Sequence, residues 1–472
     1  MITGIIPDRQ SFYNKSTRRL TSFDFKSNDT LDLESICIFT ALGFFMGDTT
    51  YFQNTRVLKP ASEYKVEDNR IEGQHQIWSW QYNPRDISFD QTVEEFSHLY
   101  QKISKEQVTG KRVILPLSGG LDSRSQAVVL GKSDEITAYS YEFENGINEN
   151  KYGRAIAREQ GYKYTSMMIP KSYLWPVIED LAKLNHCLSD FTHQRQMAVK
   201  SQYQNMGNLF FLGHWGDVLF DDMGVPDRLS DDEITETICI KVLKKGGKDI
   251  GMALWEAWGL KGSFIQALRD RISGLLTAIK IDHANAKVRA FKSLYWAPRW
   301  TSVNLCVFQD SHDVALPYYH NEMCKYICTV PEEFLAGRKI QIAYIKKLAP
   351  DLAKIPWQNF DPCNLYNYHD YYSLKYLPVR AFRNIKRNLN QKIFGKSKLI
   401  TRNWEIQFVG KENERQLKEY LFKNKPFQEW VPESLTRKFF NKFKEEDDVF
   451  NAHPLSMLLT LSVFAKLRNE DV

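Results

Sequence analysis

The sequence predicts an α/β protein with a doubly wound parallel sheet and a mostly helical C-terminal portion. The first observation is that short apolar runs of strand type alternate with helical patterns between residues 111 and 212. The second is that a glycine turn follows both the first and the last of these runs. The third is that helical patterns dominate beyond residue 228.

The run that opens the sheet is Lys111–Leu117, which reads K-R-V-I-L-P-L and ends at a glycine turn. Its β-branched and apolar residues suit a strand that is buried on both faces. Further strands are expected at Ile136–Phe143, Tyr164–Ile169 and Asn208–Leu212, and helices at Ser125–Leu130 and Asn150–Gln160. Strands that alternate with helices in this way are typical of parallel βαβ units.

The chain upstream of this strand is expected to lead into the sheet. Residues 1–30 are polar and are interpreted as a loose lead-in. The apolar pattern from Leu31 to Gly43 predicts a helix, and a second helix is expected over residues 92–108. Short strands are expected around Val57 and at Tyr64–Val66.

Composition and charge exclude several classes of protein. The 472 residues include 43% hydrophobic and 25% charged side chains, which excludes a disordered or fibrous chain. A net charge of +6 is too mild to indicate a nucleic-acid partner. The longest uncharged runs, 201–216 and 449–465, contain polar residues, so no membrane span is expected. The start shows no signal-peptide pattern and the seven cysteines form no C-x-x-C pair, which favours reduced thiols and a cytoplasmic location.

The most informative segment is the loop after the first strand, where residues 117–124 read L-S-G-G-L-D-S-R. Two glycines let successive N–H groups point at one anion, two serines add hydroxyl donors, and the following helix offers its positive end. These residues are Ser118, Gly119, Gly120 and Ser123. Asp122 would repel a phosphate unless a cation lay between them, so we interpret it as a Mg²⁺ ligand. A glycine turn with incidental serines is the alternative.

A second segment of this kind follows the last strand of the alternating region. Residues 212–222 read L-G-H-W-G-D-V-L-F-D-D. Asp217 is a candidate second carboxylate for a complex of magnesium and pyrophosphate. An ordinary turn with a helix cap is the alternative for this segment. Together the two loops predict a site for a phosphate group with Mg²⁺.

The first loop carries S-G-G-x-D-S, the signature of the PP-loop of enzymes that split ATP into AMP and pyrophosphate. With both loops, the chain resembles the synthetase part of glutamine-dependent asparagine synthetases, a group that includes β-lactam synthetases and lasso-peptide cyclases. R-V-L-K-P-A-S-E-Y at 56–64 and L-P-Y-Y-H-N-E-M-C-K-Y-I at 316–327 extend the likeness. It implies a PP-loop, adenine nucleotide alpha hydrolase-like domain at 111–360, after a lead-in and connector at 1–110 and before a helical extension at 361–472.

The resemblance also implies roles for particular residues. The pyrophosphate loop would comprise Ser118, Gly119, Gly120, Asp122 and Ser123, and the positions beside the adenosine would be Leu117, Tyr141 and Gly213. Asp217 matches the second aspartate on the magnesium side. Lys339 matches, loosely, a lysine that neutralises charge as the α-phosphate is attacked, because K-I-Q-I-A stands here for K-x-x-L-R. Arg338 is an equally basic neighbour, and a solvated helix lysine is the alternative for Lys339.

Three departures from the family limit what the resemblance implies. The family's glutaminase begins with a catalytic cysteine, whereas Met1 is followed here by Ile2, so we expect no glutamine hydrolysis by that route. His214 stands in place of a glutamate tied to proton handling; a neutral imidazole could accept a proton from an amine, and an inert replacement is the alternative. P-Y-Y-H at 317–320 replaces P-F-L-D, which leaves the acceptor carboxylate open.

A basic segment between Lys375 and Arg402 contains no acidic residue and repeats apolar residues every three or four positions, which predicts an amphipathic basic helix. Such a helix can hold RNA, an anionic membrane surface or a phosphorylated substrate, or it can cover the core.

The sequence therefore predicts an ATP-dependent amide-bond-forming ligase. A small-molecule or biosynthetic-intermediate carboxylate would become an acyl-adenylate with release of pyrophosphate, and would then pass to an amine or to ammonia, possibly from a separate glutaminase. One alternative is a nucleotide-binding scaffold of the same fold that has lost turnover. Another is a PP-loop RNA-modifying enzyme, which the missing C-x-x-C pair disfavours.

Overall fold

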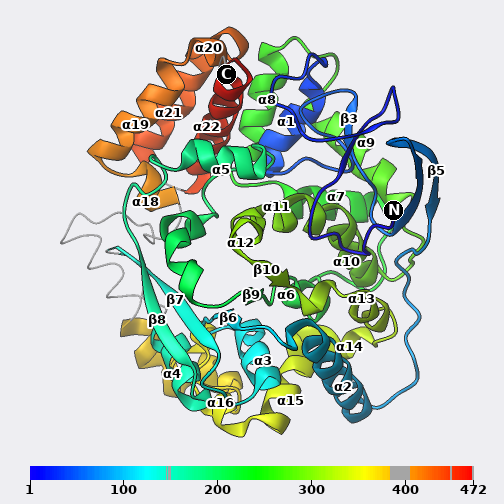
Figure 1. Cartoon of the computed structure of the whole chain (residues 1–472), viewed down its shortest axis with the longest axis vertical. Coiled ribbons are helices and arrows are strands. Elements are labelled where there is room, and N and C mark those ends of the chain that lie inside the picture. Colours follow the sequence, from blue (N-terminus) through cyan, green and yellow to red (C-terminus); the bar gives the residue numbers. More distant parts are fainter. Residues whose placement is uncertain (145, 147–149, 383–403, 447–448, 470–472) are drawn as a thin grey trace.

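The computed structural model describes residues 1–472 except residues 145, 147–149, 383–403, 447–448 and 470–472. One hydrophobic cluster extends from Ile5 to Leu467, so both ends of the described chain contribute to the same core. A parallel sheet and a large set of helices surround this core (Figure 1).

The parallel sheet confirms the predicted α/β class. Its strands are β6 (Val113–Pro116), β7 (Thr137–Phe143), β8 (Lys163–Ile169), β9 (Leu209–Phe211) and β10 (Asp313–Ala315), in the order β10-β9-β6-β7-β8. Ile114 of β6 lies opposite Thr137 on one side and Phe210 on the other. Each run that the sequence predicts as a strand of this sheet holds one, whereas β10 is not predicted.

The chain builds this sheet outward from β6, first in one direction and then in the other. Helix α3 (Leu121–Leu130) joins β6 to β7, and α4 (Asn150–Gln160) joins β7 to β8. The chain then returns to place β9 on the opposite side of β6. In open parallel sheets, ligands bind beyond the carboxyl ends of the strands where the order reverses. The loops after β6 and β9 therefore meet at the position that favours a ligand.

Residues 1–30 belong to the folded core, so the expectation of a loose lead-in is wrong. Four of their apolar side chains are buried in the main cluster, namely Ile5, Ile6, Phe12 and Phe23. Strand β1 (Phe12–Asn14) pairs antiparallel with β2 (Leu20–Thr21) and β3 (Thr55–Val57). Strands β4 (Ser62–Glu67) and β5 (Arg70–Gln76) form a separate hairpin. The average polarity of residues 1–30 gives no sign of these few buried side chains. Their burial depends on packing partners that lie far away in the sequence.

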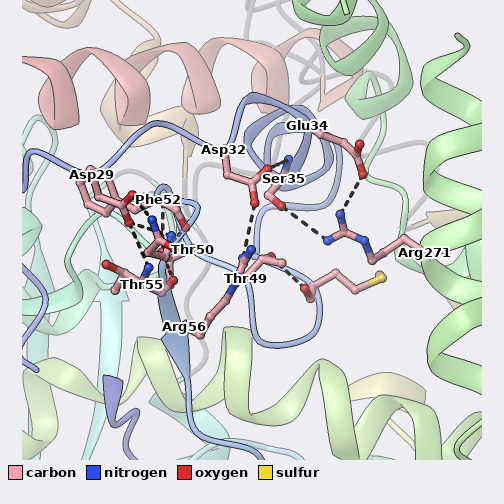
Figure 2. A network of polar contacts seen from close by, with 12 residues as sticks. Asp29, Asp32, Glu34, Ser35, Thr49, Thr50, Phe52, Thr55, Arg56 and Arg271 are labelled. Atoms are coloured by element: carbon pink, nitrogen blue, oxygen red, sulfur yellow. Dashed lines mark hydrogen bonds and ion pairs between the residues drawn. The ribbon is translucent and has the colours of Figure 1, made fainter. Parts of the chain in front are cut away.

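A network of polar contacts fixes the loop between helix α1 (Leu33–Leu42), which confirms the predicted first helix, and strand β3 (Figure 2). Asp32 caps α1 by accepting a hydrogen bond from the Ser35 N–H at 3.1 Å, and it also pairs with Arg56 at 3.4 Å. Asp29 accepts a hydrogen bond from the Thr55 N–H at 3.2 Å. These carboxylates tie the residues just before α1 to the start of β3.

The chain beyond residue 228 is mostly helical, as predicted. Its α-helices are α7 (Asp231–Val242), α8 (Gly247–Ala257), α9 (Phe264–Leu276), α10 (Ala284–Tyr295), α11 (Ser302–Asn304), α12 (Cys306–Ser311), α13 (Asn321–Ile327), α14 (Glu332–Leu335), α15 (Lys339–Leu348), α16 (Pro350–Lys354), α18 (Trp404–Phe408), α19 (Lys411–Phe422), α20 (Lys425–Trp430), α21 (Glu433–Glu446) and α22 (Val449–Asn469). Earlier helices are α2 (Phe89–Val108), α5 (Ile178–Asn185) and α6 (Gly216–Leu219). The described chain also contains a π-helix, η2 (Ala297–Thr301), and 3₁₀ helices at η1 (Arg195–Asn205), η3 (Pro317–Tyr319), η4 (Ala336–Arg338), η5 (Gln358–Phe360), η6 (Tyr368–Tyr372) and η7 (Leu374–Tyr376).

The C-terminal helices lie at the opposite end of the molecule from α4 and α16 (Figure 1). Helix α22 packs against α19, α20 and α21 and also against α1, so the end of the chain closes over its beginning. The predicted basic helix falls largely on residues 383–403, which lie outside the described residues. Among the helices that are described, none combines the length and apolar character needed to cross a bilayer.

Candidate functional site

The loop after β6 carries the S-G-G-L-D-S motif and opens helix α3. The hydroxyls of Ser118 and Ser123 lie 3.0 Å apart, and the Gly120 N–H donates to the Ser118 Oγ at 3.3 Å. Gly120 is the N-cap residue of α3 and provides no side-chain cap. The first N–H groups of a helix are where a phosphate oxygen can take the capping role.

The loop after β9 packs directly against this first loop. A Cβ at Gly213 would lie 2.9 Å from the Cβ of Asp122, and a Cβ at Gly216 would lie 2.3 Å from its Oδ1. Trp215, between the two glycines, has a left-handed backbone with a φ of 77°, and its indole N–H donates to the Ser293 Oγ at 3.0 Å. Glycine at both positions therefore allows the close contact between the two loops.

Asp122 lies where the two loops meet. Its Oδ1 pairs with the guanidinium of Arg338 and accepts a hydrogen bond from the Gln341 Nε2 at 3.0 Å. Gln341 also donates to the hydroxyl of Tyr318 at 2.8 Å. Burial raises the pKa of Asp122, Arg338 opposes this shift, and the nearby Asp217 adds to it. A carboxylate in such surroundings is stabilised by a cation beside it.

The structure brings Arg338, and not Lys339, to this carboxylate. Arg338 precedes helix α15 with a left-handed backbone (φ 59°), and its side chain reaches Asp122. Lys339 is exposed, and its ammonium donates to the carbonyl of Glu333 at 2.9 Å. Of the two basic neighbours that the sequence left open, Arg338 is therefore the one that contacts the loop.

His214 and Asp217 both belong to the second loop. Asp217 is exposed on α6, whereas His214 is partly buried beside Phe308, with 6.4 Å between the ring centroids. The Nδ1 of His214 is buried and has no hydrogen-bond partner among the described residues. Burial lowers the pKa of His214 to about 4, an effect that Asp217 opposes and Arg195 reinforces. The imidazole is therefore uncharged near neutral pH.

Of the three residues expected beside an adenosine, Leu117 and Tyr141 lie around the ends of β6 and β7, and Gly213 follows β9. Leu117 is buried, and its N–H donates to the Tyr139 carbonyl at 2.8 Å. The hydroxyl of Tyr141 lies 2.9 Å from that of Tyr203, and the guanidinium of Arg195 lies 5.2 Å from the Tyr141 ring centre. Their contact with adenosine stays a prediction.

Gln358 covers the glycine turn of the first loop. The Gly119 N–H donates to the Gln358 Oε1 at 3.1 Å, and a Cβ at Gly119 would lie 2.6 Å from the Gln358 Cβ. Asp361 holds this segment, because it pairs with Lys151 at 2.7 Å and accepts from the Tyr152 hydroxyl at 2.9 Å. The Gly119 N–H of the proposed phosphate loop is thus already hydrogen-bonded to the Gln358 side chain. Gln358 must move before a pyrophosphate group can accept a hydrogen bond from this N–H.

Replacing Gln358 by alanine is expected to tighten ATP binding. The substitution removes an acceptor that competes for the Gly119 N–H, and a hydrogen bond of net value near 1 kcal/mol corresponds to a Kd about fivefold lower. Titration calorimetry with a non-hydrolysable ATP analogue and Mg²⁺ measures the change. Asn359→Ala, at the exposed neighbouring position, is the matched control. Weaker binding by Gln358→Ala would instead make Gln358 part of the nucleotide site.

Arg124 is a residue of the first motif whose role the sequence did not predict. Its fully buried guanidinium donates to the carbonyls of Leu352 and Ile355 at 3.0 and 2.9 Å, and to that of Pro356 at 3.1 Å. It therefore ties the start of α3 to the segment that leads to Gln358. The position of Arg124 in the motif could have marked it as a functional residue. No local sequence pattern indicates that its hydrogen-bond acceptors lie more than 200 residues later in the chain.

The two acidic residues fit a magnesium ion that arrives with phosphates. Mg²⁺ in nucleotide sites takes one or two carboxylates and completes its shell with water and phosphate oxygens. Asp122 and Asp217 supply two carboxylates, and the contacts of Asp122 given above both fall on its Oδ1. The described part of the chain contains no group of three or more His, Cys, Asp or Glu side chains arranged to hold a metal.

The fold and the site define an α/β protein in which two glycine loops meet around a partly buried acid–arginine pair, where the order of a parallel sheet reverses. No family model matches the chain, and no curated protein matches it at a significant level. A function for this chain therefore rests on the chemistry of these loops.

Proposed function

We propose that this chain is an ATP-dependent, amide-bond-forming ligase of the asparagine synthetase type, with a PP-loop domain at residues 111–360. The observation that carries the proposal is the contact of the S-G-G-L-D-S loop with the second glycine loop at Asp122. The two loops follow β6 and β9, between which the sheet reverses its order. Backbone N–H groups at a helix start, beside two acids, suit a triphosphate with its metal.

In the first half of the proposed reaction, the N–H groups of Gly119 and Gly120 bind phosphate oxygens. Mg²⁺, when bound, supplies positive charge that stabilises the departing pyrophosphate. An oxygen of the substrate carboxylate attacks the α-phosphorus, the bond from that phosphorus to the bridging oxygen breaks, and pyrophosphate leaves. The guanidinium of Arg338 stabilises the charge that develops on the α-phosphate. The product of this half is an acyl-adenylate.

In the second half, an amine nitrogen attacks the acyl carbon and AMP departs. The nitrogen then carries an excess proton that a base must remove. The neutral imidazole of His214, with its buried Nδ1 unsatisfied by the described residues, is suited to accept it. Ammonia, an amine substrate or a separate glutaminase would supply the nitrogen.

Turnover of α-³²P-labelled ATP with Mg²⁺, a panel of carboxylic acids and either ammonia or amines tests the proposal. We expect labelled AMP, and one pyrophosphate for each amide formed, only when a suitable acid is present. Formation of labelled ADP, or the absence of acid-dependent AMP from protein that binds ATP, would exclude the ligase.

Replacing His214 by alanine is expected to slow amide formation without slowing adenylate formation. Amide formation should fall about 10²-fold, because general base catalysis contributes at least that much, while acid-dependent exchange between ATP and pyrophosphate stays at the wild-type level. His214→Glu should retain amide formation, since a carboxylate can accept the proton. Because the pKa of His214 is about 4, the wild-type amide step should show no titration near pH 6.5. Equal loss in both halves would make His214 a structural residue.

A nucleotide-binding scaffold without turnover is the second candidate. Two contacts favour it, because Gln358 takes the Gly119 N–H and Arg338 takes the Asp122 carboxylate, and both groups would have to change partners for ATP with Mg²⁺ to bind. Binding of labelled ATP without acid-dependent AMP formation would support this candidate over the ligase.

A further inference from the structure

A cavity of about 400 Å³ lies between the N-terminal segment, the β4–β5 hairpin and the helices α9 and α10. In Figure 1 this part of the molecule lies near the label of the N-terminus, beside β5 and α10. Leu58, Leu275, Ile279 and Leu294 provide apolar walls. The volume falls in the range of small-molecule sites, and none of the lining residues belongs to the candidate site above.

Three polar side chains that line this cavity each retain a buried atom without a hydrogen-bond partner in the described part of the chain. These atoms are Nη1 of Arg299, the indole Nε1 of Trp80 and Oε1 of Gln10. Arg299 is 3% exposed and Trp80 is 5% exposed. Leaving such an atom unsatisfied costs about 1–3 kcal/mol, so a ligand whose polar groups reach these side chains from the cavity would stabilise the protein by completing their hydrogen bonds.

Arg299 is also a buried cation without an ion-pair partner among the described residues. Its other nitrogens donate to backbone carbonyls, Nε to Phe45 at 3.1 Å and Nη2 to Thr49, which belongs to the network of Figure 2. Burial lowers the pKa of Arg299 to about 9, which Asp48 opposes without reaching ion-pair distance. An anionic group in the cavity would supply the missing counter-charge.

We propose that this cavity binds a small organic monocarboxylate with an apolar body and a hydroxyl group. The carboxylate accepts hydrogen bonds from Arg299 Nη1 and Trp80 Nε1, and the hydroxyl donates to Gln10 Oε1. The apolar body contacts the leucine and isoleucine walls. Arg9, Lys59 and Asp48 also line the cavity, so together with Arg299 its lining carries a net positive charge that favours an anion.

Gly274 of α9 provides a matched pair of variants. It lines the cavity, and a Cβ built on it meets no atom within 4 Å. Gly274→Trp fills the space beside the helix, whereas Gly274→Ala adds one methyl group and favours the helix. Trp80→Phe tests one donor, because it removes the indole N–H and keeps an aromatic ring. Since that N–H makes no hydrogen bond to the described residues of the ligand-free protein, any fall in the melting temperature of this variant should come only from the smaller ring.

Titration calorimetry with 4-hydroxyphenylacetate and with shikimate tests the proposal in the full chain. We expect at least one of them to bind wild type and Gly274→Ala equally, Gly274→Trp at least about 20-fold more weakly and Trp80→Phe about tenfold more weakly. The neutral 4-hydroxyphenylacetamide should bind at least about tenfold more weakly than its acid. Binding of neither acid, binding unchanged by Gly274→Trp, or a preference for inorganic phosphate would each overturn the proposal.

Discussion

Replacing Asp122 by asparagine is expected to lower acid-dependent exchange between ATP and pyrophosphate about 10³-fold. Loss of a carboxylate that holds the metal removes several kcal/mol of charge stabilisation from the transition state. The amide keeps an oxygen for the hydrogen bonds from Arg338 and Gln341, so the local packing is retained. Exchange of labelled pyrophosphate into ATP, measured across a range of Mg²⁺ concentrations, reports the effect.

Two controls separate a loss of metal binding from a loss of fold. Asp222→Asn makes the same chemical change at an exposed acid close to the second loop and should leave exchange unchanged. Asp122→Asn removes the counter-charge of a partly buried arginine, so its melting temperature and its far-ultraviolet circular dichroism should be recorded beside the rate. A folded Asp122→Asn protein with the wild-type rate would remove Asp122 from the proposed mechanism.

The strands that position the site were predictable because each is coded by a short local run. Strand β6 needs only the apolar residues before the glycine turn, whose burial follows from its central place in the sheet. Strand β10 was not predictable, since its three residues D-V-A form a strand through pairing with β9, in which the partner of Asp313 is Leu209, 104 residues earlier. The burial of Ile5 and Phe12 likewise depends on distant elements, and a polar local average concealed it.

The two glycine loops were predictable as motifs, but their partners were not. Gln341 stands at an unspecified position of the K-I-Q-I-A segment, and Gln358 lies outside any motif. They contact Asp122 and Gly119 through the fold of the later helices. The choice between Arg338 and Lys339 depended on one backbone angle, which neither composition nor spacing specifies. The sequence therefore predicts the candidate phosphate loop of such a site. The residues that contact the loop become known only from the structure.

The pair Arg338 and Lys339 gives the second large expected effect. Arg338→Ala should lower acid-dependent exchange about 10²- to 10³-fold, as the loss of an oxyanion-stabilising donor does in other enzymes. Lys339→Ala should leave the rate within about twofold, because its exposed ammonium contacts the Glu333 carbonyl and a surface interaction contributes little. Both rates come from the same exchange assay, with ATP affinity measured separately by calorimetry.

The reason for the expected difference is an exchange of cations at Asp122. In the described structure the guanidinium of Arg338 is the counter-ion of this partly buried carboxylate. A magnesium ion that bound the carboxylate would replace Arg338 there, and the Arg338 guanidinium could then contact the α-phosphate. Lys339 could reach the loop only after breaking its hydrogen bond to the Glu333 carbonyl of α14. Arg338→Lys should therefore recover part of the rate by restoring the charge without the two-pronged geometry. If Lys339→Ala abolished exchange and Arg338→Ala did not, the helix start at residue 339 would have to rearrange when ATP binds.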